Sequence, residues 1–171
     1  SSPGLSFLLW TIAEFGEEAY LGFWDGLKDN ILTIANSWDT SFDFFLRGEA
    51  SIIVSFSTDE AFDVIVNDST RTQVLTPEGQ AYRTIFGAGV VRDTAQPELA
   101  RQFLNVLLSR EVQSAISETE YMIPANGNAT ARAIWFQNVV IPENPLLLPA
   151  DLVAENLNRW LDEWVETVLT N

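Results

Sequence analysis

The amino-acid sequence predicts an α/β protein with a mainly parallel sheet and flanking helices. Short β-branched runs alternate with stretches whose apolar residues recur at helical spacing, which is the pattern of a layered α/β fold. Hydrophobic residues make up 47% of the 171 residues, enough for a packed core. No uninterrupted apolar run reaches the roughly 18 residues of a membrane span. Ligands of such folds bind where strands end and helices begin.

The N-terminal quarter of the sequence predicts three helices and one strand. Ser2 and Pro3 suit a helix start, so we expect a helix through Phe15 that ends at Gly16. The remaining elements expected here are a helix over 17–28, a buried strand over 31–35 and an amphipathic helix over 38–47 that ends at Gly48.

The middle of the sequence predicts two further strands around one helix. The run 51–56 is strand-like, and a turn at Ser57-Thr58 leads into a helix over 59–66. A polar loop or crossover over 67–81 precedes a strand over 84–91.

The C-terminal part of the sequence is predicted to be mainly helical. Pro97 opens a helix through Leu108, Ser109 caps a second helix over 110–116, and 150–169 forms the last and longest helix. A loop is expected at 126–130, and three prolines, Pro142, Pro145 and Pro149, indicate an extended connection before the last helix.

Composition excludes several classes of function. The net charge of −15 repels nucleic acid. Acidic residues are scattered along the chain and Lys28 is the only lysine, a pattern typical of halophilic proteins, although an acidic mesophilic protein is the alternative. The absence of cysteine and histidine removes disulfides, thiolate nucleophiles, imidazole bases and the usual zinc ligands. We therefore expect no metal and no cofactor.

Two groups of residues are candidates for binding a ligand. Ser1 and Ser2 lie at a helix start, where they either cap the helix or bind an anion. Aromatic residues lie beside the expected strand ends and in a short segment after a helix. Stacked aromatic faces would suit a flat cationic ring, although each of these side chains taken singly is better explained as a core residue. These candidates are Trp38, Phe56 with the adjoining Ser57, Phe62 and Tyr121.

Two further patterns carry less weight. Acidic pairs such as Asp59-Glu60 would be needed for a carboxylate-dependent hydrolase, but 24 scattered acids produce such pairs by chance. Two sequons, Asn67-Asp68-Ser69 and Asn128-Ala129-Thr130, permit glycosylation if the chain is exported.

Several segments in register resemble the bacterial thiamine-binding proteins that serve ATP-driven importers. The resemblance runs from Ser1 to about Pro124 and resumes in the last helix. It is carried by Ser1-Ser2-Pro3-Gly4-Leu5, Trp38 with Phe42, Phe45-Leu46-Arg47-Gly48-Glu49, Ser55-Phe56-Ser57-Thr58, Ala61-Phe62, Gln96-Pro97-Glu98-Leu99-Ala100, Trp160 and Trp164.

This resemblance implies the type II periplasmic-binding fold, two α/β lobes hinged around a cleft, with the N-terminal portion lacking here. It implies a second-lobe segment over 1–80 that carries cleft residues, and a crossover strand with helices returning to the first lobe over 81–171. Trp38 corresponds to a stacking Trp of the family, Phe62 to a usual Tyr, Tyr121 to a Trp, and Ser1 to a serine beside the ligand phosphate.

The resemblance also implies a function. The expectation is a non-catalytic component of an ABC importer that captures thiamine or a thiamine phosphate outside the cytoplasm and presents it to a membrane permease. The full-length form is expected to be a lipid-anchored monomer. Alternatives are a relative for another organic cation, a polyamine, an oxyanion or ferric ion, a carboxylate-dependent hydrolase, or a purely structural fragment. Ferric-binding relatives use adjacent tyrosines as iron ligands. Iron is therefore disfavoured here, because Tyr20, Tyr82 and Tyr121 are far apart in sequence.

Overall fold

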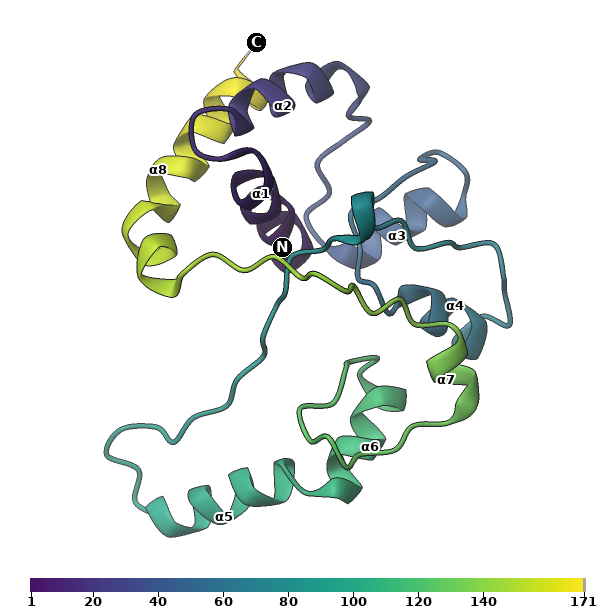
Figure 1. The fold of residues 1–171 in the computed structure, drawn as a ribbon, viewed down its shortest axis with the longest axis vertical. Helices are drawn as coiled ribbons and strands as arrows, with labels where there is room; N and C mark the ends of the chain where they lie inside the picture. Colours follow the sequence, from purple (N-terminus) through teal and green to yellow (C-terminus); the bar gives the residue numbers. More distant parts are fainter. Residues whose placement is uncertain (171) are drawn as a thin grey trace. The chain divides into compact units, whose positions relative to one another are not determined.

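The computed structural model describes residues 1–170, and its secondary structure is helical (Figure 1). The elements in chain order are α1 (Ser2–Phe15), α2 (Tyr20–Leu27), η1 (Lys28–Asn30), α3 (Trp38–Leu46), α4 (Asp59–Val66), η2 (Pro77–Gly79), α5 (Pro97–Leu107), α6 (Arg110–Thr119), α7 (Ala133–Gln137) and α8 (Ala150–Leu169).

The helices expected from sequence are confirmed, with ends that differ by a few residues. Proline opens α1 and α5, and the Ser109 side chain accepts a hydrogen bond from the Val112 N–H at the start of α6. Gly16 and Gly48 follow helices with positive φ angles of 78° and 74°, a conformation that glycine adopts without steric cost. The short α7 has no counterpart among the expected elements.

The three expected strands run through the chain as extended segments without strand partners. Across residues 1–170 the backbone forms no strand, and Tyr82 and Leu146 make an isolated parallel bridge. Leu32, Ile52 and Ile85 in these segments are 61%, 74% and 72% exposed, so the prediction of a buried strand over 31–35 is wrong. A strand needs a neighbour to satisfy its backbone groups, and in the described chain none of these three segments is paired in a β-ladder.

The described chain separates into two compact units. Unit 1 comprises 1–55, 77–84 and 142–171, and unit 2 comprises 56–76 and 85–141. Unit 1 therefore contains α1, α2, α3 and α8, and unit 2 contains α4, α5, α6 and α7.

Unit 1 has an apolar core at the junction of α1, α2 and α8. Its buried members are Leu8, Leu9, Ile12, Tyr20, Trp24 and Trp160. Trp160 and Tyr20 are completely buried, and Trp24 meets Trp164 edge to face with ring centroids 5.5 Å apart. Because α8 packs along α2, the last helix closes the core that the first two begin.

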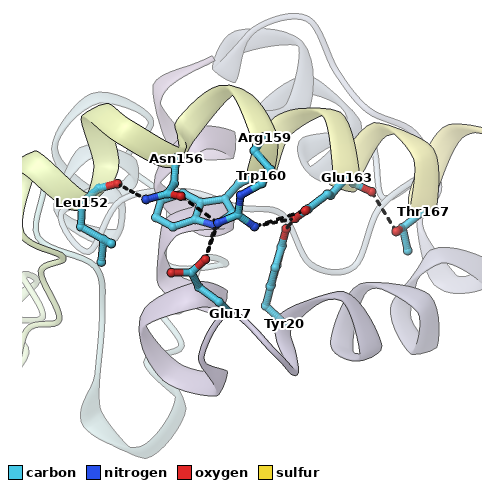
Figure 2. A network of polar contacts seen from close by, with 8 residues as sticks. All are labelled: Glu17, Tyr20, Leu152, Asn156, Arg159, Trp160, Glu163 and Thr167. Atoms are coloured by element: carbon cyan, nitrogen blue, oxygen red, sulfur yellow. Dashed lines mark hydrogen bonds and ion pairs between the residues drawn. The ribbon is translucent and has the colours of Figure 1, made fainter.

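A polar network joins α8 to the turn between α1 and α2 (Figure 2). Arg159 forms an ion pair with Glu17, which also accepts a hydrogen bond from Trp160 Nε1 at 3.2 Å. The Arg159 hydrogen bond lowers the pKa of Glu17. On the next turn of α8, Glu163 accepts a hydrogen bond from the Tyr20 hydroxyl at 2.5 Å. Burial, together with this bond, raises the pKa of Tyr20.

Unit 2 has a smaller apolar core and more buried polar groups. Ala61 on α4 and Trp135 on α7 are fully buried, and these two helices pack against each other. The buried polar residues of this unit are Thr58, Asp59, Asp63, Gln113 and Ser117. Among them, Asp63 and Gln113 anchor loops of this unit to its helices through hydrogen bonds.

Candidate functional site

Trp38 lies at the first residue of α3, where local capping fixes its position. The Ser37 side chain accepts a hydrogen bond from the Thr40 N–H at 3.2 Å, which is the usual way to start a helix. The Trp38 indole is half-buried and stacks on Phe42 with centroids 4.9 Å apart and an interplanar angle of 15°. Its Nε1–H donates to Ser55 Oγ at 2.7 Å. The stacked Phe42 ring and the hydrogen bond to Ser55 both help to hold the indole in place.

Phe56 and Ser57 form the entry to α4. The Phe56 N–H donates to Asp59 Oδ2 at 2.9 Å, and the Asp59 N–H donates to the Phe56 carbonyl at 3.1 Å. Asp59 and Glu60 also place negative charge in the first turn, where the helix dipole favours it. The Ser57 carbonyl accepts from the Val140 N–H at 3.0 Å, which ties this entry to the segment after α7.

Phe62 and Tyr121 are brought together although they are far apart in sequence. Phe62 lies on α4, and Tyr121 lies just beyond α6, which ends at Thr119. Their ring centroids are 5.0 Å apart and the rings meet edge to face at 87°. Both side chains are half-buried.

Tyr121 has a strained backbone. Its φ angle is 52°, in the left-handed region that non-glycine residues rarely adopt. Such a conformation costs on the order of 1–3 kcal/mol and is concentrated at functional sites. The chain therefore turns sharply after α6 and presents the Tyr121 ring beside Phe62.

Asp63 fixes the loop that follows α4. Its fully buried carboxylate accepts hydrogen bonds at 2.9 Å from Asn67 Nδ2 and from Thr72 Oγ1. Burial alone would raise the pKa of Asp63, but the hydrogen bonds from Asn67, Thr72 and Ser69 outweigh it and lower the pKa. The carboxylate is therefore held ionised as a structural anchor one residue from Phe62.

Gln113 anchors the chain near Tyr121, as Asp63 does near Phe62. Its side-chain oxygen accepts from the Ala125 N–H at 2.7 Å, and its Nε2 donates to the Leu107 carbonyl at 2.8 Å. The buried amide thereby joins the end of α5 to the segment that follows Tyr121. This arrangement restrains the chain on the C-terminal side of the aromatic pair.

Ser1 and Ser2 lie at the start of α1, as expected, but their detailed roles differ from plain capping by Ser2. Ser1 occupies the N-cap position, Ser2 is the first helical residue, and the Ser1 side chain forms no capping hydrogen bond. Both residues are exposed. Capping by Ser2 is therefore wrong, whereas anion binding at this helix start stays a prediction.

The site residues expected from sequence divide between the two units. Trp38, Ser1 and Ser2 belong to unit 1, whereas Phe56, Ser57, Phe62 and Tyr121 belong to unit 2. The contact between Phe62 and Tyr121 lies within unit 2. Membership of all seven residues in one ligand site remains a prediction.

Sequence reasoning missed the residues that position these rings, namely Ser55, Asp63 and Gln113. Asp63 had a local signal, because it lies four residues before Asn67 on a helix. Ser55 and Gln113 contact segments 17 and 12 residues away and had no such signal.

A hollow elsewhere in unit 1 does not include any expected site residue. It is lined by Lys28, Ile31, Thr33, Ile34, Val168 and Leu169. None of these six residues carries a carboxylate, so the hollow offers no pair of acids for hydrolysis.

Two features are absent from residues 1–170. No group of three or more acidic residues is arranged to hold a metal ion. No helix in this range is both long and apolar enough to cross a bilayer.

Comparison with known proteins gives consistent matches. The chain is 32% identical over 166 residues to the thiamine-binding periplasmic protein of Brucella melitensis, covering 96% of this chain and 49% of that protein. It is 28% identical to the thiamine-binding periplasmic protein of Escherichia coli K12, covering 98% of this chain and 50% of that protein. The chain thus spans about half the length of these relatives.

A solved structure agrees in fold as well as in sequence. The periplasmic thiamin binding protein superposes with a TM-score of 0.81 at 28% identity, covering 98% of this chain and 52% of that one. This match confirms the expected periplasmic-binding fold for the part of that structure that the chain covers. The model of the family described as bacterial extracellular solute-binding protein matches residues 10–121. The chain therefore belongs to the bacterial extracellular solute-binding protein family.

Proposed function

We propose that the protein is the extracytoplasmic binding component of an ABC importer and captures thiamine or a thiamine phosphate. The observation that carries this proposal is the edge-to-face pair of Phe62 and Tyr121, with Tyr121 in a strained conformation, in a chain whose relatives are named thiamine-binding. No chemical step is involved. Binding and release of the vitamin are the whole function.

Aromatic faces suit this ligand because thiamine contains a positively charged ring. A cation over an aromatic face gains about 0.5–2 kcal/mol, and more when water is excluded. In the proposed site Trp38 stacks on the ligand, and Phe62 and Tyr121 offer further aromatic faces, with Phe56 and Ser57 at the entry to α4. The net charge of −15 adds a long-range attraction for the cation at low salt.

The start of α1 is the proposed place for a ligand phosphate. The helix has 14 residues, and its first N–H groups and dipole favour an anion there. Ser1 and Ser2 are exposed and can add hydroxyl donors. Thiamine phosphates would then engage both the aromatic rings and this helix end, whereas thiamine would engage the rings alone.

Membership of the family supports a proposal for the cellular setting. We propose that the protein acts outside the cytoplasm, is held near the membrane by a lipid anchor in its full-length form, acts as a monomer, and delivers its ligand to a membrane permease. The scattered carboxylates and single lysine support a halophilic source. We also propose that 1–80 belongs to the second lobe and carries ligand-binding residues, and that 81–171 leads back to the first lobe.

Titration calorimetry at high salt tests the proposal. Thiamine should give saturable heat with one site per chain, and thiamine phosphate should bind at the same site. Spermidine, choline and ferric citrate serve as competitors of other classes. Saturable heat from one of these, with none from thiamine, would contradict the proposal.

The second candidate is a related binding protein for another organic cation. Phe62 and Tyr121 favour it equally, because an aromatic pair attracts cations of many shapes. The competitor panel separates the two candidates: choline displacing thiamine at equal concentration would favour a general organic-cation binder.

A further inference from the structure

The two sequons of the chain differ in the hydrogen bonds that their asparagine side chains make. Both Asn67-Asp68-Ser69 and Asn128-Ala129-Thr130 satisfy the acceptor pattern for N-glycosylation. Modification requires that the asparagine Nδ2 and the hydroxyl two residues later reach the active site of a transferase. The partners of each side chain therefore decide which sequon can react in the folded protein.

Asn67 is exposed, as Asn128 is, but its side-chain amide is held by a hydrogen bond within unit 2. Asn67 is the residue that ends α4, and its Nδ2 donates to the buried Asp63 carboxylate at 2.9 Å. The Ser69 N–H donates to the Asp63 carbonyl at 3.2 Å, and the Ser69 hydroxyl accepts from the Arg71 N–H at 3.3 Å. Both ends of this sequon are thus bound to the anchor that fixes the loop after α4.

Asn128 lies in a turn that hydrogen bonds to Asn126 stabilise. The Ala129 N–H donates to the Asn126 carbonyl, and the Asn128 N–H donates to Asn126 Oδ1, both at 2.9 Å. Asn126 Nδ2 in turn donates to the Leu108 carbonyl at 2.8 Å. Asn126 therefore supplies the contacts that shape the turn, and the Asn128 side chain makes no hydrogen bond to any residue from 1 to 170.

The rest of the second sequon is equally accessible. Asn128 and Thr130 are both exposed. The Thr130 N–H donates to Ser114 Oγ at 2.8 Å, which fixes the backbone. The hydroxyl oxygens of Thr130 and Ser114 lie 3.5 Å apart, at the limit of a hydrogen bond. A transferase can therefore engage the Thr130 hydroxyl without breaking a strong contact.

We propose that Asn128 is an N-glycosylation site of the exported protein and that Asn67 is not modified once the chain has folded. The donor is a polyprenyl-linked oligosaccharide with a phosphate or pyrophosphate leaving group. Asn128 Nδ2 attacks the anomeric carbon, the C–N bond forms as the sugar–phosphate C–O bond breaks, and a base of the transferase takes the amide proton. The lipid phosphate leaves, and no oxidation or reduction occurs.

The expected preference follows from the Asn67 contacts. A hydrogen bond to a charged group contributes enough to lower the population of free Asn67 amide by about ten- to a hundred-fold. Asn128 has no such cost to overcome. Modification of the folded protein should therefore favour Asn128 by about tenfold or more.

The test is a transfer reaction in solution, independent of export and of thiamine binding. The folded protein is incubated with a purified oligosaccharyltransferase that accepts Asn-X-Ser/Thr and with its lipid-linked oligosaccharide. Trypsin then places the sequons in separate peptides, 48–71 and 111–132, for mass spectrometry. Sugar is expected on the second peptide, and the first should acquire it only when the protein is unfolded in urea before transfer.

Matched variants complete the test. N128Q should abolish the modification of the folded protein, T130S should retain it, and N67Q should leave it unchanged. D63N should raise modification at Asn67 by weakening the contact that holds its amide. Equal occupancy of both sequons in folded protein would overturn the proposal, as would the absence of sugar on Asn128 while a short control peptide is modified.

Discussion

The two units of the chain are stabilised in different ways. Unit 1 buries a cluster of large apolar side chains from α1, α2 and α8, with Trp160 and Tyr20 completely inaccessible. Unit 2 buries Ala61 and Trp135 together with five polar residues, of which Asp63 and Gln113 anchor loops. Most of the proposed ligand residues, including the pair Phe62 and Tyr121, belong to unit 2.

This difference bears on where in the chain ligand-binding residues can lie. The core rings Tyr20, Trp24 and Trp160 of unit 1 are buried and offer no face to a ligand. In unit 2, polar anchors hold loops in position and leave the Phe62 and Tyr121 rings half-buried. The stability of unit 1 is therefore expected to fall most when a buried side chain is truncated, and that of unit 2 when a specific hydrogen bond is removed.

The largest effect is expected in unit 1 from Trp160→Ala. The side chain is fully buried among α1, α2 and α8, so its removal should lower the free energy of unfolding by about 3–5 kcal/mol. Urea denaturation followed by tryptophan fluorescence measures the loss. Val165→Ala on the same helix, where Val165 is 42% exposed, is the control and should cost about 0.5 kcal/mol or less. Equal losses would show that unit 1 has no apolar core.

In unit 2 the matching change is Asp63→Asn. One carboxylate oxygen is replaced by a donor facing Asn67 or Thr72, so a loss of about 1–3 kcal/mol is expected. Hydrogen exchange of the peptide 59–76 measures it, and Asp68→Asn, an exposed neighbour, is the control.

The same variant has a defined pH dependence. Because folding lowers the pKa of Asp63 below its usual 3.8, the carboxylate contributes stability above that value and loses it as pH falls through the folded pKa. The difference between the wild type and Asp63→Asn should therefore be full near neutral pH and shrink in acid. A difference that stays constant down to the lowest pH would contradict this role.

A smaller effect is expected from Tyr20→Phe in unit 1. The substitution keeps the buried ring and removes the hydrogen bond to Glu163, so the expected loss is about 0.5–1.5 kcal/mol. Folding raises the pKa of Tyr20 above its usual 10.0, so this stability is complete below pH 10 and declines as pH rises through the folded pKa. Thermal unfolding from pH 7 to 11 should show a constant difference between the two proteins up to about pH 10 and a shrinking difference above it.

The smallest effect on stability is expected from Tyr121→Gly in unit 2. Glycine removes the cost of the left-handed conformation, on the order of 1–3 kcal/mol. It also loses the ring contact, about 0.5–1.5 kcal/mol, and the burial of a half-buried ring, about 1–2 kcal/mol. The gain and the losses nearly cancel, so thermal unfolding should shift little while thiamine affinity falls. A large loss of stability would show that Tyr121 is a structural residue of unit 2.

The helices could be predicted from sequence because their signals are local. Pro97, Ser109 and Gly48 mark helix ends through contacts or conformations that their neighbours determine. The expected strands differ, because apolar runs such as 31–35 indicate an extended backbone but do not specify a neighbour.

The candidate site was predictable only in part, for the same reason. The sequence indicates that Phe62 and Tyr121 are aromatic and lie near the ends of elements. Their contact depends on a turn with positive φ at Tyr121 and on long-range bonds from Gln113, which no local pattern encodes. The short α7, which buries Trp135, was missed because five residues give too little periodicity.

The central claim is that aromatic faces hold a cationic ring, and the affinity of Tyr121→Leu for thiamine tests it most directly. Calorimetry should show affinity lower than that of the wild type by about 0.5–2 kcal/mol, or about two- to thirty-fold. Phe103→Leu is the control, because Phe103 is 60% exposed on α5 and lies outside the proposed site. It should bind thiamine as the wild type does. Unchanged affinity in Tyr121→Leu, or an equal loss in both variants, would contradict the account.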